Sequence, residues 1–464
     1  MFVGRATELD YLNRRYRGGK FEFAIIYGRR RVGKTTLINE FIKNKEVVYY
    51  TGIESNSKEN LEGLSKSIYT LSMDFVETSG SFISFWEALE TIFRISMKRR
   101  IVFVIDEYPY LANSYKSISS ILQVLIDKNK ESSKMFLILC GSSMSFMEEQ
   151  VLGYKSPLFG RRTCQFKIRP FEFVDTTKFF TKFSKVDLAT VYGITGGIPL
   201  YLSLMDENLS IEDNIKNNFL EPNAYLFEEP TNLIKQECRD PTQYNSIIKA
   251  IANGATKMSE ICSKTGIESA LAASYLNKLI SLGITKKEKP LGANNTRKAI
   301  YVLEDSMFRF WYRFIPENIA AINRRLTETV YKKIDITAFM GVVFEEICKQ
   351  YLWELNRQSI ATIPFMDLGR WWGNDPKKKQ ESEIDIMGIG DGNQAIFCEC
   401  KWTNEKVDVS ILDNLVCKST LFNKTKVHYY VFAKTGFTKG CQARAEELGN
   451  VSLVQFEDMF RIHK

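Results

Sequence analysis

Histidine is nearly absent from this chain of 464 residues, which holds only His428 and His463. Two histidines cannot form a histidine-rich metal centre, and we expect no Ser-His-Asp triad. Paired cysteines are also lacking, because the nine cysteines are odd in number and contain no C-x-x-C spacing. We therefore expect reduced thiols rather than a disulfide framework. Any hydrolytic chemistry must use carboxylates, lysines, water and metal.

Long apolar runs are missing as well. The longest, at 101–105 and 136–140, fall far short of the roughly 18 residues needed to cross a bilayer, so no membrane partner is expected. Residues 1–5 show no basic region followed by an apolar stretch, so we expect no secretory signal and a cytoplasmic protein. The length predicts about three domains. The composition, 44% apolar and 25% charged, is that of globular proteins.

The predicted fold class is a multidomain α/β protein. Residues 1–170 alternate apolar strand-like runs with segments of helical period, the pattern of a parallel sheet. Strands are predicted at 23–27, 47–51, 101–105, 136–140 and 164–168, and helices at 34–42, 61–71, 85–97 and 118–129. Residues 171–240 are predicted to form a helical lid that contains Gly196-Gly197-Ile198-Pro199.

Two further parts follow the lid. In residues 241–330, three helices at 244–252, 258–265 and 268–282 precede a two-stranded ribbon and a helical linker, which is a winged helix-turn-helix pattern. Residues 331–464 are predicted to form a second α/β domain. Its elements are an amphipathic helix at 339–355 and strands at 384–389, 395–401 and 427–432.

A phosphate-binding loop follows the first predicted strand. Residues 28–35, Gly-Arg-Arg-Arg-Val-Gly-Lys-Thr, fit G-x-x-x-x-G-K-[ST] at every fixed position. In such a loop the backbone N–H groups face the phosphates, Lys34 balances phosphate charge and Thr35 binds Mg²⁺. ATP and Mg²⁺ are therefore the predicted cofactors. The predicted nucleotide-binding residues of the loop are Gly28, Arg29, Arg30, Arg31, Val32, Gly33, Lys34, Thr35 and Thr36.

A pair of acids completes the predicted ATP site. The apolar run 101–105 ends in Asp106-Glu107. Asp106 is predicted to bind Mg²⁺ through water, while Glu107 polarises the attacking water as general base. The next strand ends in Cys140-Gly141-Ser142-Ser143, where Ser142 or Ser143 either senses the γ-phosphate or only forms a turn.

These motifs together resemble the archaeal-type ATPase family, which is related to AAA+ and STAND NTPases. The similarity covers roughly residues 1–235 and adds to the P-loop and Asp106-Glu107 the segments 2–5, 8–9, 141–143, 160–162, 170–171 and 196–199. It implies that Gly4 and Arg5 lie near the adenine and that Pro199 contacts nucleotide. For Arg161 or Arg162 it leaves open an arginine finger in a homo-oligomer or an ordinary surface pair.

Basic residues concentrate in the predicted winged helix. Residues 241–303 hold nine Lys or Arg and three acids, a net charge of +6 out of +8 for the chain. The ribbon is predicted to meet DNA phosphates through Lys286, Lys287, Lys289, Arg297 and Lys298, and the third helix to approach a groove through Ser269, Ser274, Asn277 and Lys278. The alternative is an internal coupler whose basic residues are only solvated.

An acid-lysine pattern marks the last part. Asp385, Glu399 and Lys401 form D-x(13)-E-x-K across an apparent hairpin. Asp385 lies opposite Glu399 if paired positions sum to 784, and Glu399 and Lys401 then share its face. The two carboxylates would hold Mg²⁺ with the Cys400 carbonyl, while Lys401 steadies the attacking water. All three are predicted catalytic residues for phosphodiester hydrolysis.

This part resembles the C-terminal domain commonly attached to these ATPases, through the segments 369–372 and 399–402. That domain is similar to the restriction-endonuclease-like PD-(D/E)xK fold, which implies an assisting glutamate, Glu345 or Glu346, on the first helix. No proline precedes Asp385, so an active nuclease and an inactive buried ion pair stay open. Trp371 and Trp372 are predicted to pack rather than to stack on bases.

The predicted function is therefore ATP binding and hydrolysis, with nucleotide state controlling a DNA-binding winged helix and a metal-dependent nuclease. The alternative is a STAND-like ATP-dependent switch whose C-terminal domain is an inactive scaffold.

Overall fold

The computed structural model describes residues 2–71, 80–293, 298–376 and 379–461. The chain divides into two compact units. The first comprises Met1–Phe171 with Ile198–Leu200, and the second comprises Glu172–Gly197 with Tyr201–Lys464. Most of the predicted lid and the whole of the two later parts lie in the second unit, so the boundaries predicted among them stay predictions.

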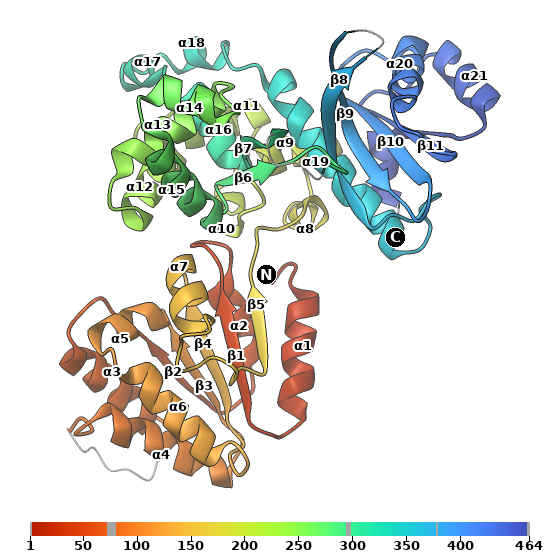
Figure 1. Cartoon of the computed structure of the whole chain (residues 1–464). Helices are drawn as coiled ribbons and strands as arrows, with labels where there is room; N and C mark the ends of the chain where they lie inside the picture. The colour runs from red at the N-terminus through yellow and green to blue at the C-terminus, as the bar shows by residue number, and fades with distance from the viewer. Residues whose placement is uncertain (1, 72–79, 294–297, 377–378, 462–464) are drawn as a thin grey trace. The chain divides into compact units, whose positions relative to one another are not determined.

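A parallel five-stranded sheet forms the first unit (Figure 1). Its strands are β1 (Glu22–Tyr27), β2 (Val47–Thr51), β3 (Val102–Asp106), β4 (Phe136–Gly141) and β5 (Cys164–Lys167), in the order β2-β3-β4-β1-β5. The parallel sheet predicted from the apolar runs is confirmed, and each strand end falls within one residue of its prediction. Because β4 lies between β1 and β3, the carboxyl ends of these three strands meet at one edge of the sheet.

Helices cover both faces of this sheet. Ala24 and Ile26 of β1 join one core, with α1 and α2, whereas the alternating residues Phe23 and Ile25 join the core on the opposite face. Strands buried on both faces read as continuous apolar runs, which is why the sequence located them. The helices are α1 (Ala6–Arg17) and α2 (Lys34–Ile42) on one face, and α3 (Ser57–Tyr69), α4 (Phe85–Lys98), α5 (Tyr108–Ser114) and α6 (Ile118–Asn129) on the other.

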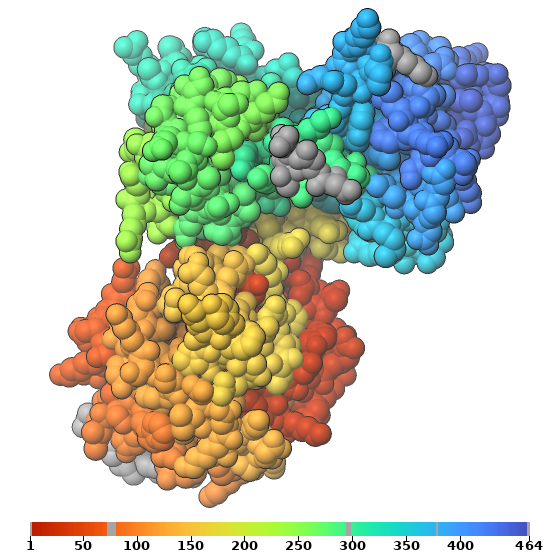
Figure 2. All heavy atoms as spheres, viewed as in Figure 1, coloured from red at the N-terminus to blue at the C-terminus, as the bar shows by residue number. Residues whose placement is uncertain are grey.

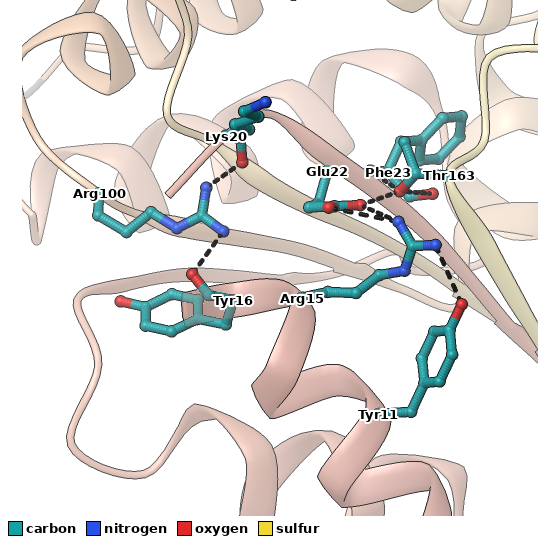
Figure 3. Close-up of polar contacts among 8 residues, drawn as sticks. All are labelled: Tyr11, Arg15, Tyr16, Lys20, Glu22, Phe23, Arg100 and Thr163. Carbon is teal, nitrogen blue, oxygen red and sulfur yellow. Dashed lines mark hydrogen bonds and ion pairs between the residues drawn. The ribbon is translucent and has the colours of Figure 1, made fainter. Parts of the chain in front are cut away.

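Two arginines fasten α1 to the amino ends of the strands (Figure 3). Arg15, in the last turn of α1, forms an ion pair of 3.0 Å with Glu22 at the start of β1 and donates to the Tyr11 hydroxyl at 3.0 Å. Arg100, just before β3, donates through Nη2 to the Tyr16 carbonyl at 3.0 Å. The clamp lies at the edge of the sheet opposite the P-loop, so it anchors α1 without entering the predicted nucleotide site.

The second unit opens with helices and a hairpin. In chain order these are α8 (Phe173–Thr177), α9 (Lys185–Thr195), α10 (Pro199–Leu202, which begins in the first unit), α11 (Ile211–Phe219), α12 (Tyr225–Glu237), α13 (Pro241–Ala252), α14 (Met258–Thr265), α15 (Ser269–Ser281), the antiparallel strands β6 (Thr285–Glu288) and β7 (Ile300–Leu303), α16 (Ser306–Phe314), α17 (Ile319–Asn323) and α18 (Thr327–Tyr331). The predicted order of three helices and a ribbon is observed. Arg297 lies outside the described residues.

A mixed sheet packed on a long helix ends the chain. The helix is α19 (Ile336–Arg357), and the strands are β8 (Asp367–Asp375), β9 (Gln380–Ile389), β10 (Gln394–Lys401), β11 (Lys426–Ala433) and β12 (Val451–Gln455), with α20 (Val409–Ser419) and α21 (Lys439–Leu448) between them. The order is β12-β11-β10-β9-β8, antiparallel from β8 to β10 and parallel from β10 to β12. Trp371 packs against the core of this sheet, as predicted. Across the described ranges, no helix has the length and apolarity that a membrane crossing requires.

Candidate functional site

The loop between β1 and α2 is built for close contact with an anion. A Cβ on Gly28 would lie 2.3 Å from the carbonyl oxygen of Ile168, so only glycine fits there. Gly33 has a φ of +89°, a left-handed conformation that also favours glycine. The helix α2 starts at the next residue, Lys34, so its first backbone N–H groups face the loop.

Lys34 lies folded over this loop. Its Nζ donates to the carbonyl oxygens of Gly28 at 2.9 Å and Arg29 at 3.0 Å, and the residue is 6% exposed. Burial lowers the pKa of Lys34 from its ordinary value. A buried ammonium whose hydrogen-bond partners are neutral carbonyls is best stabilised by an anion, as the predicted phosphates would provide.

Asp106 and Thr35 meet at the edge of the sheet. Thr35 Oγ1 donates to Asp106 Oδ2 at 3.0 Å, and the same oxygen accepts from the Tyr49 hydroxyl at 2.7 Å. The strand β3 is shifted by one residue from its predicted range of 101–105. Asp106 is therefore its last residue rather than the residue after it. A hydroxyl beside a carboxylate is a hard oxygen donor set, so these residues fit Mg²⁺.

Glu107 follows in a left-handed backbone conformation with φ +47°. Gly52 follows the neighbouring strand β2. A Cβ on Gly52 would lie 2.7 Å from the carbonyl oxygen of Glu107, so a side chain at this position would crowd the turn. Ser142, just after β4, donates to Glu107 Oε2 at 2.9 Å through Oγ. Strained backbone at a carboxylate is typical of functional sites. Ser142 therefore contacts Glu107, and its predicted role toward the γ-phosphate stays a prediction.

The amino-terminal segment lies beside the P-loop. A Cβ on Gly4, which has a φ of +66°, would lie 2.5 Å from the ring of Phe171. The Arg5 guanidinium stacks on the same ring at 4.5 Å and donates to the Val32 carbonyl at 3.3 Å. Pro199, which is distant in sequence, also lies beside the loop. Its Cγ would be 3.6 Å from a Cβ on Gly33. The structure thus brings Arg5 and Pro199 to the P-loop, and Gly4 to the ring of Phe171.

The remaining loop and arginine-finger candidates have distinct surroundings. Arg30 Nη2 donates to the Tyr110 hydroxyl at 3.0 Å, Arg31 has a φ of +72°, and Thr36 is exposed at the start of α2. Arg161 forms an ion pair of 2.6 Å with Asp127, the contact expected of an ordinary surface pair.

The β9–β10 hairpin has the predicted register. Its pairs, which end with Ile386 and Cys398, sum to 784, and Asp385 and Glu399 are the next residues of the two strands beyond this last pair. Asp385 Oδ2 accepts from the backbone N–H of Cys400 at 2.8 Å. The sheet thus places the two predicted carboxylates at the same point of the hairpin.

Both oxygens of Glu399 are held by lysines. Lys401 Nζ lies 2.7 Å from Oε1, and Lys418 Nζ lies 3.2 Å from Oε2. Lys418 comes from α20, and the sequence reasoning missed it because no fixed spacing joins it to Glu399. Burial lowers the pKa of Lys401, but the charge and hydrogen bond of Glu399 together with the charge of Asp385 outweigh burial, so that this pKa lies above its ordinary value. The predicted pair of Glu399 and Lys401 is therefore part of a triad.

Burial and like charge act on two acids of this site. Burial, and then the charge of Glu399, raise the pKa of Asp385 to about 6. Burial, and then the charge of Asp385, raise the pKa of Glu345 to about 7. The assisting role predicted for Glu345 or Glu346 stays a prediction. Such carboxylates suit a divalent cation. In the described part of the chain, however, no three or more His, Cys, Asp or Glu side chains are grouped to hold a metal.

The predicted wing, of which residues 285–293 and 298–303 are described, contacts the C-terminal sheet through Leu291. Leu291 N donates to the Arg370 carbonyl of β8 at 2.8 Å, and the Leu291 side chain belongs to the core of that sheet. Figure 2 shows the two parts meeting within the second unit. The half-buried side chain of Lys286 pairs with Glu288 at 2.7 Å, and its predicted contact with phosphates stays a prediction. Lys287, Lys289 and Lys298 are exposed.

Comparisons with known proteins match two parts of the chain. Residues 2–205 match a family described as an ATPase domain predominantly from Archaea, and residues 311–412 match archaeal and bacterial proteins of unknown function. An uncharacterized protein of Methanocaldococcus jannaschii is 32% identical over 463 residues, which covers 99% of this chain and 100% of that protein. An uncharacterized ATP-binding protein of the same organism is 51% identical over 47 residues, 10% of this chain and 80% of that protein.

Among solved structures, a Walker-type ATPase of Pyrococcus abyssi is similar in fold. It aligns with a TM-score of 0.51 and 17% identity over 67% of this chain and 96% of that chain. The P-loop geometry, the match over residues 2–205 and the end-to-end relative lead to one conclusion. The chain carries a P-loop ATPase domain and belongs to the family of ATPases found predominantly in Archaea.

Proposed function

We propose that the chain binds ATP with Mg²⁺ and hydrolyses it where the carboxyl ends of β1, β3 and β4 meet. The observation that carries this proposal is the convergence of Lys34, Thr35, Asp106 and Glu107 at that edge. The Thr35 hydroxyl and the Asp106 carboxylate are 3.0 Å apart, and the buried Lys34 lies on the loop beside them.

Each of these side chains has a defined task. Lys34 leaves its loop carbonyls and pairs with the β- and γ-phosphates, while the loop N–H groups bind the same oxygens. Thr35 and Asp106 would hold Mg²⁺, which neutralises phosphate charge when bound. Glu107 orients and deprotonates the attacking water, and Ser142 keeps its carboxylate in place.

Calorimetry on the full chain tests this proposal. Lys34→Ala is expected to lose ATP binding, because Lys34, which lies folded over the loop, is the cation that the proposal pairs with the terminal phosphates. The control is Lys43→Ala, which removes an exposed lysine at the other end of α2, where it pairs with Glu40. ATP binding by Lys34→Ala at wild-type affinity would refute the assignment.

We further propose that the three-helix part and the wing bind DNA as a winged helix-turn-helix. The observed order of α13, α14, α15 and the β6–β7 ribbon supports this, as do the exposed cations Lys287, Lys289 and Lys298. Because Leu291 packs into the core of the C-terminal sheet, the wing and its exposed lysines lie against the C-terminal domain. DNA held by the wing would therefore lie along that domain.

A second candidate activity is metal-dependent phosphodiester hydrolysis in the C-terminal domain, under control of the ATP site. It is favoured by Asp385 and Glu399, which directly follow the last pair of the β9–β10 hairpin, and by the contact of Lys401 with Glu399. A PD-(D/E)xK nuclease needs these groups and no histidine. The alternative, a switch with an inactive scaffold, is favoured by Glu399, whose two oxygens are both engaged by lysines. Nicking of supercoiled DNA with Mn²⁺ separates the two, and the Asp385→Ala variant shows whether nicking comes from this site.

A further inference from the structure

The helix α19 lies between a lid helix and the acid-lysine sheet (Figure 1). One stripe of α19, Met340, Val343 and Gln350, meets α8 and α9. The opposite stripe faces the sheet, where Cys348 forms a thiol hydrogen bond with Cys400 and the charge of Asp385 acts on Glu345. In an α-helix these positions lie on opposite faces, so a displacement at one stripe moves the other.

The contact between α9 and α19 is unusually close at Gly193. A Cβ there would lie 2.9 Å from Met340 Sδ and 3.2 Å from both methyl groups of Val343. Glycine weakens a helix interior, so its use within α9 is explained by this approach of two helices. The packing leaves no room for α9 to shift without moving α19.

Hydrogen bonds reinforce this contact. Gln350 Nε2 donates to the hydroxyl of Tyr192 at 2.8 Å, and Gln350 Oε1 accepts from the backbone N–H of Phe173 at 2.8 Å. The side-chain amide of Gln350 on α19 therefore forms hydrogen bonds with both the start of α8 and the middle of α9. Because Tyr192 is buried, loss of the hydrogen bond from Gln350 would leave its hydroxyl with no water to replace that bond, which costs free energy.

The other end of α9 continues into the P-loop neighbourhood. The helix ends at Thr195, and Gly196 and Gly197 follow with φ of +63° and +68°. The chain then enters the first unit for Ile198–Leu200 and returns to the second. Within the first unit, Pro199 lies 3.6 Å from a Cβ built on Gly33, the residue before Lys34. Three residues thus join the ATP site to α9 by covalent continuity.

We propose that α9 couples the nucleotide state sensed at Pro199 to α19, and that the Gly193 and Gln350 contacts carry this coupling to the Glu345 side of the acid-lysine site. The inference rests on the ATP-binding part of the proposed function and not on nuclease activity. Such coupling requires that ATP and ADP bind with different affinity to two arrangements of Ile198–Leu200.

Hydrogen exchange of peptides from α19 tests the coupling in the full chain. Exchange is followed without nucleotide, with Mg²⁺-ADP and with a non-hydrolysable Mg²⁺-ATP analogue, at concentrations that calorimetry shows to saturate. The key variant is Gly193→Ala, which wedges a methyl group between α9 and α19. Gly341→Ala is the matched control, because Gly341 is also inside a helix and a Cβ there meets no atom within 4 Å. Tyr192→Phe removes only a hydroxyl and serves if Gly193→Ala does not fold.

We expect α19 exchange to differ between ADP and the ATP analogue in the wild type and in Gly341→Ala. In Gly193→Ala or Tyr192→Phe this difference should fall by about threefold or more, while the binding of nucleotide is retained. A contact that is only structural would alter exchange equally in all nucleotide states. The coupling is overturned if bound nucleotide leaves α19 exchange unchanged, or if both variants keep the full difference. Absence of nucleotide binding would instead refute the proposed function itself.

Discussion

Ser142 Oγ donates a 2.9 Å hydrogen bond to Oε2 of Glu107, and its backbone N–H lies 3.4 Å from the same oxygen. The two residues come from neighbouring strand ends, since β4 pairs with β3. One carboxylate oxygen is thus held by β4, while the left-handed backbone at Glu107 sets the direction of the side chain. This arrangement suits a base that must keep one oxygen free for water.

Glu107→Gln is expected to bind ATP and to lower its turnover by about 10² to 10⁴, because the amide cannot accept the proton of the attacking water. Ser142→Ala is the comparison: it keeps the carboxylate and loses only its hydroxyl anchor, so it should lower turnover much less. Phosphate release at saturating ATP measures both variants, and calorimetry confirms binding. Turnover by Glu107→Gln at the wild-type rate would exclude Glu107 as the base.

The lysines of the wing differ in exposure and in pairing, so we expect them to contribute unequally to DNA binding. Replacing the exposed Lys287, Lys289 and Lys298 by alanine should reduce the slope of log K for DNA binding against log salt by about 1 per lysine that meets a phosphate. Lys286→Ala should leave this slope unchanged, because the Lys286 side chain is paired with Glu288.

Fluorescence anisotropy with labelled duplex DNA over a range of salt concentrations measures these slopes. A variant with alanine at Lys58, Lys116 and Lys130, which are exposed on the first unit, removes the same charge elsewhere. An equal loss of slope in both triple variants would show a general charge effect and would exclude the wing as the binding surface.

The sequence predicted the parts of this molecule that depend on local pattern. The central strands of the first sheet were found because burial on both faces makes runs such as 102–105 wholly apolar. The register of the β9–β10 hairpin was found because strand periodicity leaves few alternatives. In contrast, β8 escaped prediction since its residues alternate little and are mostly half-buried.

Contacts between distant segments were beyond prediction. Lys418 lies 19 residues from Glu399 on a separate helix, and no spacing rule joins them. The ion pair of Lys286 with Glu288 was also missed. The sequence shows only that the ribbon is basic, because charge composition does not tell which side chains pack inward. The close approach at Gly193 was likewise hidden, since a helical glycine in sequence does not name the helix that it meets.

The acid-lysine site predicts an unusual pH dependence of stability. Asp385 has an ordinary pKa of 3.8, which burial raises to about 6 in the folded chain. The folded chain therefore binds more protons than the unfolded chain between these values, and stability falls as pH rises through this window. Asp385→Asn should stabilise the metal-free protein by on the order of 2 kcal/mol at pH 8 and by little at pH 4.

Urea unfolding in EDTA, followed by tryptophan fluorescence at both pH values, measures this difference. Glu381→Gln, at an exposed position of the same strand, is the control and should change stability equally little at each pH. Added Mn²⁺ should stabilise the wild type at pH 8 and not Asp385→Asn, since the carboxylate would then have its cation. A gain in Asp385→Asn that is the same at pH 4 and pH 8 would contradict the buried-charge explanation.

Lys418 provides the sharpest test of whether the C-terminal site cuts DNA. If Glu399 binds a metal there, Lys418 must hold Oε2 while Oε1 turns from Lys401 to the cation, so Lys418 acts by positioning Glu399. Lys418→Met keeps the packed length of the side chain and should lower Mn²⁺-dependent nicking about 10- to 100-fold, with weaker Mn²⁺ binding, as loss of such supporting contacts does. Lys426→Met, at an exposed lysine, should match the wild type. Nicking that survives intact in Lys418→Met and Asp385→Ala would come from elsewhere, and a wild type that never nicks would assign the triad to a structural ion pair in a nucleotide switch.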